Sequence, residues 1–92
     1  MPRKVRVIIY SKPGCHLCEE AKAVMRGADC SDLFTIKEVN IELDVELLAR
    51  YRWDIPVIMI DGTEAFRHRV KVEEFKDQIL RRSGGQPFPI TS

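Results

Sequence analysis

The spacing of hydrophobic residues changes several times along the chain, and each change marks an expected element. Val5–Tyr10 is nearly all apolar and β-branched, which is typical of a strand buried on both faces. From His16 to about Ala28, apolar residues recur every three or four positions, which predicts an amphipathic helix. Phe34–Asn40 alternates between apolar and polar residues at its start and is expected to form a half-buried strand.

The second half of the chain predicts a short helix followed by a hairpin. Asp44 is a suitable N-cap for a helix whose apolar residues extend to Tyr51. Val57–Ile60 is again entirely apolar, and Asp61-Gly62 has the composition of a tight turn. A return strand is therefore expected from Ala65 to about Arg69.

A last helix is expected over Val72–Arg82, with acidic residues at its start and basic residues at its end. The element order is then β-α-β-α-β-β-α. The first two strands should be parallel through a right-handed crossover, and the hairpin should be antiparallel. The pattern predicts an α/β fold in three layers, α/β/α, with a four-stranded mixed sheet and its two most apolar strands in the middle. We expect one domain over residues 1–92, with a flexible tail over residues 84–92.

Composition narrows the function classes. The chain of 92 residues is 45% hydrophobic and 32% charged, with a net charge of +1. It has no apolar run near the length that a membrane span needs, and its balanced charge provides no strong field for nucleic acid. The start of the chain lacks the features of a signal peptide, and three cysteines do not suggest a secreted disulfide framework. We therefore expect a monomer in the cytoplasm or an organelle matrix, with no nucleic-acid or membrane partner.

Cys15 and Cys18 form a C-x-x-C motif at the junction of the first expected strand and helix. Unpaired backbone N–H groups and the positive end of the helix dipole would face the sulfur of Cys15, which favours its thiolate. Lys12 is a further cation within reach. Cys18 lies one helical turn later, where it can resolve a mixed disulfide formed by Cys15. The motif thus predicts a dithiol–disulfide exchange pair in which Cys15 attacks and Cys18 resolves.

The same motif, taken alone, is equally typical of half a zinc site. Structural zinc needs four ligands, which usually include a second paired motif. The other candidate ligands are Cys30, His16 and His68, and they form no second pair. The position of the motif between a buried strand and a helix favours redox chemistry, so we assign no metal ligands.

Three segments in this order, "YSKPGCHLC", "DIPVIMIDG" and "HRV", resemble the glutaredoxin-like branch of the thioredoxin fold over most of residues 4–82. The resemblance implies a thioredoxin-like, glutaredoxin-type fold and thiol–disulfide oxidoreductase activity. It matches Lys12 to the family's lysine three residues before the first cysteine, and Cys15 and Cys18 to its C-x-x-C pair. It matches Pro56 to a cis-proline that faces the sulfur atoms. It also implies that the Ile55–Pro56 bond is cis and that the backbone of Ile55 pairs with a bound thiol substrate.

Two positions depart from the glutaredoxin pattern. His16-Leu17 stands between the cysteines where Pro-Tyr or a similar pair is usual, and a protonated His16 would stabilise the Cys15 thiolate. Glutathione-binding members carry a Gly-Gly pair after the hairpin turn, whereas this chain has Ala65–Arg69. Arg67 or Arg69 would provide a carboxylate contact there, because a guanidinium group matches carboxylate geometry.

The resemblance implies no obligatory cofactor, with glutathione as a co-substrate. The expected partners are a disulfide-containing protein or glutathione, together with a thioredoxin- or glutathione-type reductant. Two other functions remain open. Some glutaredoxins hold an iron–sulfur cluster between two subunits through the first cysteine and glutathione, which would make the chain an iron–sulfur or metal carrier. A redox-inert module of this fold would instead bind a peptide.

Overall fold

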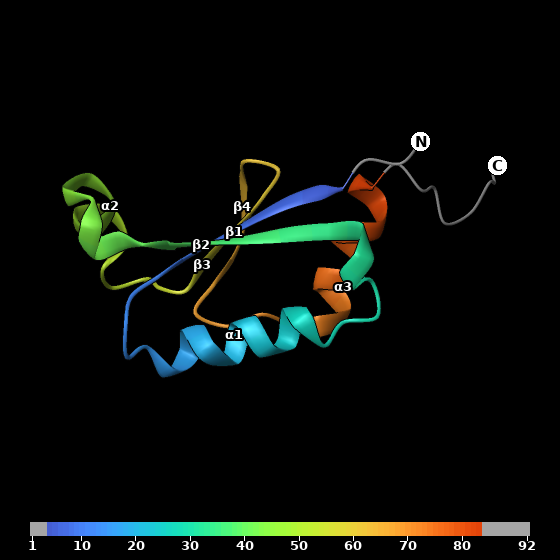
Figure 1. The fold of residues 1–92 in the computed structure, drawn as a ribbon, viewed down its shortest axis with the longest axis horizontal. Coiled ribbons are helices and arrows are strands. Elements are labelled where there is room, and N and C mark those ends of the chain that lie inside the picture. Colours follow the sequence, from blue (N-terminus) through green and yellow to red (C-terminus); the bar gives the residue numbers. More distant parts are fainter. Residues whose placement is uncertain (1–3, 84–92) are drawn as a thin grey trace, which may run out of the picture.

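The computed structural model describes residues 4–83 and contains the expected order of elements (Figure 1). Each of the three helices begins where the sequence pattern predicts. The expected tail over residues 84–92 lies outside the described residues. The elements are the strands β1 (Val5–Ser11), β2 (Phe34–Asn40), β3 (Val57–Ile60) and β4 (Thr63–Arg67), the helices α1 (His16–Arg26), α2 (Val45–Tyr51) and α3 (Val72–Arg82), and the 3₁₀ turns η1 (Ser31–Leu33) and η2 (Ile41–Leu43).

Several boundaries differ from the sequence prediction by one or two residues, two of them for clear local reasons. β4 begins at Thr63 instead of Ala65, because the hairpin turn uses only Asp61 and Gly62, with φ of 50° and 83°. Positive φ at both central residues is what a two-residue hairpin turn of type I′ requires. α1 ends at Arg26, and its C-cap is Gly27, whose N–H donates to the carbonyl of Ala23.

The four strands of residues 4–83 form a mixed sheet in the order β2-β1-β3-β4, with β1 and β2 parallel and the other pairs antiparallel. The apolar strands β1 and β3 are therefore central, as predicted. The register pairs Tyr10 with Val57 and Ser11 with Asn40. The ends of β1 and β2 and the start of β3 consequently meet at one edge of the sheet.

The two faces of the sheet are covered unequally. Val5, Val7 and Ile9 are at most 1% exposed and pack into the core together with residues of α1 and α3. On the opposite face, α2 covers one end of the sheet, where the rings of Tyr10 and Tyr51 stack 5.0 Å apart. Figure 1 shows α2 at the end of the sheet far from α3. The three expected layers are present, and the layer formed by α2 is short.

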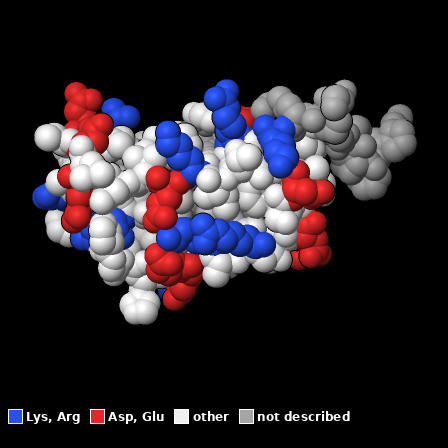
Figure 2. Space-filling view, viewed as in Figure 1, with Lys and Arg blue, Asp and Glu red and all other residues white. Residues whose placement is uncertain are grey.

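The start of α2 is held by the predicted cap. The Asp44 side chain accepts hydrogen bonds from the backbone N–H groups of Glu46 and Leu47, at 2.9 and 3.1 Å. On the surface shown in Figure 2, acidic and basic side chains are interspersed. Within residues 4–83, no helix is both long enough and apolar enough to cross a membrane.

Candidate active site

The loop that joins β1 to α1 places Cys15 at the N-cap of the helix. Cys15 has extended backbone angles, and its Sγ accepts a hydrogen bond from the backbone N–H of Cys18 at 3.2 Å. The loop turns through Gly14, whose φ of +80° suits glycine. The Cys15 sulfur therefore occupies the end of α1 where unpaired N–H groups and the helix dipole favour negative charge.

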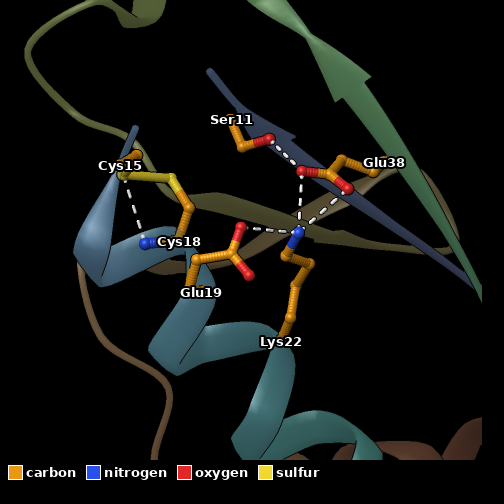
Figure 3. Close-up of polar contacts among 6 residues, drawn as sticks. All are labelled: Ser11, Cys15, Cys18, Glu19, Lys22 and Glu38. Atoms are coloured by element: carbon orange, nitrogen blue, oxygen red, sulfur yellow. Dashed lines mark hydrogen bonds and ion pairs between the residues drawn. A yellow bond between two sulfur atoms is a disulfide. The ribbon is translucent and has the colours of Figure 1, made fainter. Parts of the chain in front are cut away.

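Cys15 and Cys18 are joined by a disulfide bond, with Cα atoms 5.2 Å apart. Their environments differ. Cys15 is partly exposed, whereas Cys18 is only 1% exposed and lies behind it in the first turn of α1 (Figure 3). An external reagent can therefore approach the Cys15 sulfur more easily than the Cys18 sulfur.

The Ile55–Pro56 peptide bond is cis, which confirms the expectation drawn from the resemblance. Pro56 is buried and precedes β3, while Ile55 is partly buried. Because Val57 pairs with Tyr10 near the end of β1, the Ile55–Pro56 bond lies at the same edge of the sheet as the loop to Cys15. The backbone of Ile55 is thus brought to the end of the molecule that carries the cysteine pair.

Residues at and just after the end of β4 hold the loop around Pro56 in place. The guanidinium group of Arg67 lies 3.0 Å from the carboxylate of Asp54 and also pairs with Glu64. His68 donates its backbone N–H to the carbonyl of Pro56 at 2.7 Å. It does so with a φ of 68°, in the left-handed region. The Arg67 guanidinium, expected as a contact for a substrate carboxylate, is already held by two carboxylates of its own chain.

The remaining expected site residues lie around α1. Lys12 and His16, which precede and follow Cys15 in the sequence, are both exposed. The backbone N–H of Cys15 donates to the carbonyl of Lys12 at 3.3 Å. Arg69 lies 3.5 Å from Glu20 on the side of α1 that faces the β4–α3 loop, and both side chains are exposed. Arg69 thus remains accessible to a ligand.

Sequence reasoning missed a polar network behind the cysteine pair (Figure 3). Lys22 Nζ lies 3.0 and 3.1 Å from the two carboxylate oxygens of Glu38 and 2.9 Å from Glu19. Ser11 donates its hydroxyl to Glu38 at 2.7 Å. One signal was available in the sequence: Glu38 continues the alternation of Phe34 and Ile36, which places a carboxylate on the face of β2 that turns toward the core.

These contacts shift the pKa values of Glu38 and Lys22. The hydrogen bonds from Ser11 and then Lys22 lower the pKa of Glu38. The hydrogen bonds to Glu19 and Glu38 raise the pKa of Lys22. The pair is therefore held in its charged form.

The lowered pKa of Glu38 predicts how stability depends on pH. A carboxylate with a lowered folded-state pKa adds stability above its ordinary pKa of 4.5, and this stability is lost as the pH falls through the lowered value. We expect wild type to exceed Glu38→Gln in stability by a few tenths to about 1 kcal/mol at pH 7, since Glu38 is partly exposed. The difference should shrink below pH 4.5. Urea denaturation at several pH values measures it, with the exposed-site variant Glu73→Gln as control; a constant difference down to pH 3 would contradict the assignment.

The third cysteine belongs to the core. Cys30 is 4% exposed among the apolar residues packed under the sheet, and burial raises the pKa of its thiol. Within residues 4–83, no three or more His, Cys, Asp or Glu side chains are arranged to hold a metal ion.

Comparisons with solved structures agree with this fold. Protein Ne2328 from Nitrosomonas europaea has a TM-score of 0.69 and 26% identity, covering 85% of this chain and 92% of its own. The thioredoxin of Fasciola hepatica has a TM-score of 0.58 and 20% identity, covering 88% of this chain and 83% of its own. A mutant thioredoxin from Halobacterium salinarum has a TM-score of 0.59 and 14% identity, covering 88% of this chain and 76% of its own. The two thioredoxins establish a shared fold only.

Sequence comparison identifies the family. Residues 6–80 match the model of the Glutaredoxin-like domain (DUF836). The Glutaredoxin-like protein YDR286C homolog of Dictyostelium discoideum is 32% identical over 89 residues, covering 87% of this chain and 82% of that protein. The cysteine pair, the cis-proline loop and all of the four-stranded sheet except Val5 lie within residues 6–80. This chain therefore belongs to the glutaredoxin-like (DUF836) family and has the thioredoxin fold.

Proposed function

We propose that this protein is a dithiol–disulfide oxidoreductase in which Cys15 attacks and Cys18 resolves. The observation that carries the proposal is the asymmetry of the pair: Cys15 is partly exposed and its sulfur accepts a backbone hydrogen bond at the start of α1, whereas Cys18 is buried behind it. Such an environment lowers the pKa of a thiol and increases its thiolate fraction. Lys12 and His16, which flank Cys15, would add to this effect.

The proposed reaction is a pair of thiol–disulfide exchanges. The Cys15 thiolate attacks one sulfur of a substrate disulfide, a new S–S bond forms, and the other substrate sulfur leaves as a thiolate that takes up a proton. Cys18 then loses its proton and attacks the Cys15 sulfur of the mixed disulfide. This step releases the second substrate thiol and forms the Cys15–Cys18 disulfide. The substrate gains two electrons, and the protein loses two.

The loop before β3 is the proposed place where substrate binds. Ile55 lies at the same edge of the sheet as the loop to Cys15. Its backbone N–H and C=O groups would pair with the extended backbone of the substrate. Arg67 and His68 hold this loop through Asp54 and the Pro56 carbonyl. Arg69, which lies beside Glu20 of α1 and is exposed, would be available for a substrate carboxylate.

The proposed partners are a disulfide-containing protein or glutathione, with glutathione or a thioredoxin-type dithiol as reductant. Two glutathione molecules, or one dithiol, supply the two electrons that regenerate the reduced pair. The reaction needs no bound cofactor. A reducing compartment such as the cytoplasm suits a pair that must be reduced after each turnover.

The test is the rate of Cys15 alkylation against pH, measured in a Cys18→Ser/Cys30→Ser variant. We expect the rate to follow a thiolate that titrates well below the ordinary thiol value of about 8.5. Oxidised protein with both active cysteines is then offered glutathione or a thioredoxin with its reductase. Fast reduction by glutathione would identify it as co-substrate, and reduction by thioredoxin alone would assign that reductant. The proposal would be overturned if Cys15 of the variant reacted slowly and titrated like a free thiol, and if the oxidised Cys15–Cys18 pair resisted both reductants.

A further inference from the structure

Three elements bring polar side chains together behind the cysteine pair. Lys22 follows Cys18 by four residues on α1, so both side chains lie on the same face of the helix. Ser11 continues the alternation of Val7 and Ile9 on the side of β1 that faces α1, and Ile9 is in register with Glu38. Figure 3 shows Ser11 and Lys22 both directed at the carboxylate of Glu38, with Cys15 and Cys18 at the start of the helix that carries Lys22.

Burial makes the charge of Lys22 unusual. Its side chain is only 11% exposed, and its Nζ makes close ionic contacts with two carboxylates. Lysine is almost never buried without such partners, because taking its charge out of water costs free energy that an ion pair only partly recovers. An apolar side chain would pack against α1 and the sheet without this cost, so stability alone does not account for a lysine at this position.

We propose that Lys22 and Glu38 are positioning residues that set the stability of the thiolate at the Cys15–Cys18 pair. The inference rests on the proposed exchange reaction. A disulfide is uncharged, and in the proposed reaction its reduction leaves a negative charge on the pair as the Cys15 thiolate. The ammonium group of Lys22 favours this charge and the carboxylate of Glu38 opposes it. Together they hold the thiolate at a stability between those that either charge alone would produce.

The other charged groups near the network act more weakly. Lys12 in the β1–α1 loop is exposed, and the Glu19 side chain is 70% exposed against 43% for Glu38, so water and salt screen Lys12 and Glu19 more strongly. Arg26, one turn beyond Lys22, also attracts Glu38. β1 contributes the uncharged Ser11. The buried ammonium of Lys22 and the carboxylate bound to it are therefore the charges whose removal should matter most.

The test compares Lys22→Met, Glu38→Gln and the double variant, all in a Cys30→Ser background. Each protein is equilibrated at pH 7 with mixtures of reduced and oxidised dithiothreitol, and the reduced fraction is measured by mass after alkylation. We expect Lys22→Met to lower and Glu38→Gln to raise the equilibrium constant for reduction, each by about three- to tenfold. The double variant should return to within about twofold of wild type, because it removes both charges.

A second readout is the pH profile of Cys15 alkylation, with Cys18→Ser added to each variant. The midpoint should move up in Lys22→Met and down in Glu38→Gln. Glu19→Gln removes an exposed carboxylate that also contacts Lys22, and it should change the equilibrium less than about twofold. Lys22→Arg keeps the charge and should also resemble wild type. Lys22→Gln replaces Lys22→Met if the latter does not fold.

Shifts in the same direction for Lys22→Met and Glu38→Gln, or no shift in either, would overturn the inference and leave a purely structural ion pair. These readouts need no turnover, so the two proposals can fail separately. Opposite shifts in a protein that reduces no disulfide substrate would remove the proposed function and keep the inference. If the wild type were active and the variants showed unchanged equilibria, the proposed function would stand and the inference would fail.

Discussion

Cys15→Ser is expected to abolish disulfide reduction, whereas Cys18→Ser is expected to stop the reaction at a mixed disulfide. A serine hydroxyl at the N-cap of α1 can still accept the backbone hydrogen bond that Cys15 accepts, so the helix should form normally. It remains protonated at neutral pH and cannot exchange with a disulfide. Activity should therefore fall on the order of a thousandfold or more.

The Cys18→Ser variant separates the two chemical steps. Its Cys15 can attack, but no buried thiol stands behind it to release the product. Mass spectrometry should therefore detect a covalent adduct between Cys15 and one half of the substrate, which dithiothreitol removes. Reduction of a small disulfide, followed by absorbance of the released thiol, measures the activity of both variants. Cys30→Ser, at a core site away from the pair, is the control and should remain active. Full activity in Cys15→Ser would leave a binding module of this fold as the better explanation.

The second large effect is on stability: Phe75→Ala is expected to cost about 3–5 kcal/mol. Phe75 has no exposed surface, and its ring meets Phe34 edge to face with centroids 5.1 Å apart. This contact joins α3 to β2, on the same side of the sheet as α1. Removing the ring deletes that contact and leaves a cavity that the surrounding strands and helices can fill only in part.

Urea denaturation followed by circular dichroism measures this loss. For a domain of this size, each kcal/mol corresponds to a fall in the melting temperature of about 4–8 °C. Leu43→Ala is the matched control, because Leu43 is 84% exposed and its truncation should change stability by less than about 0.5 kcal/mol. If Phe75→Ala and Leu43→Ala were equally stable, the packing of α3 described above would be wrong.

Much of the fold could be read from local patterns. The apolar runs of β1 and β3 predicted two central strands, because helices packed on both faces of a sheet bury its middle strands more than its edge strands. Asp44 predicted the start of α2, since a cap depends on residues two and three positions away. The C-x-x-C motif between a strand and a helix predicted where the reactive sulfur lies. The cis bond before Pro56 followed from the family resemblance and not from the local sequence. Only a small fraction of X–Pro bonds in folded proteins are cis, so the local sequence alone would predict a trans bond.

The partners of charged side chains depended on the tertiary structure. Sequence reasoning offered Arg67 for a substrate carboxylate, but the folded chain brings Asp54 to it, thirteen residues earlier. It assigned nothing to Lys22, whose partner Glu38 lies on a different element. Hydrophobic periodicity and capping are local, so a short window of sequence specifies them. Ion pairs across elements form only when strand register and helix packing set the distances, and those distances decide which charges stand behind the Cys15–Cys18 pair.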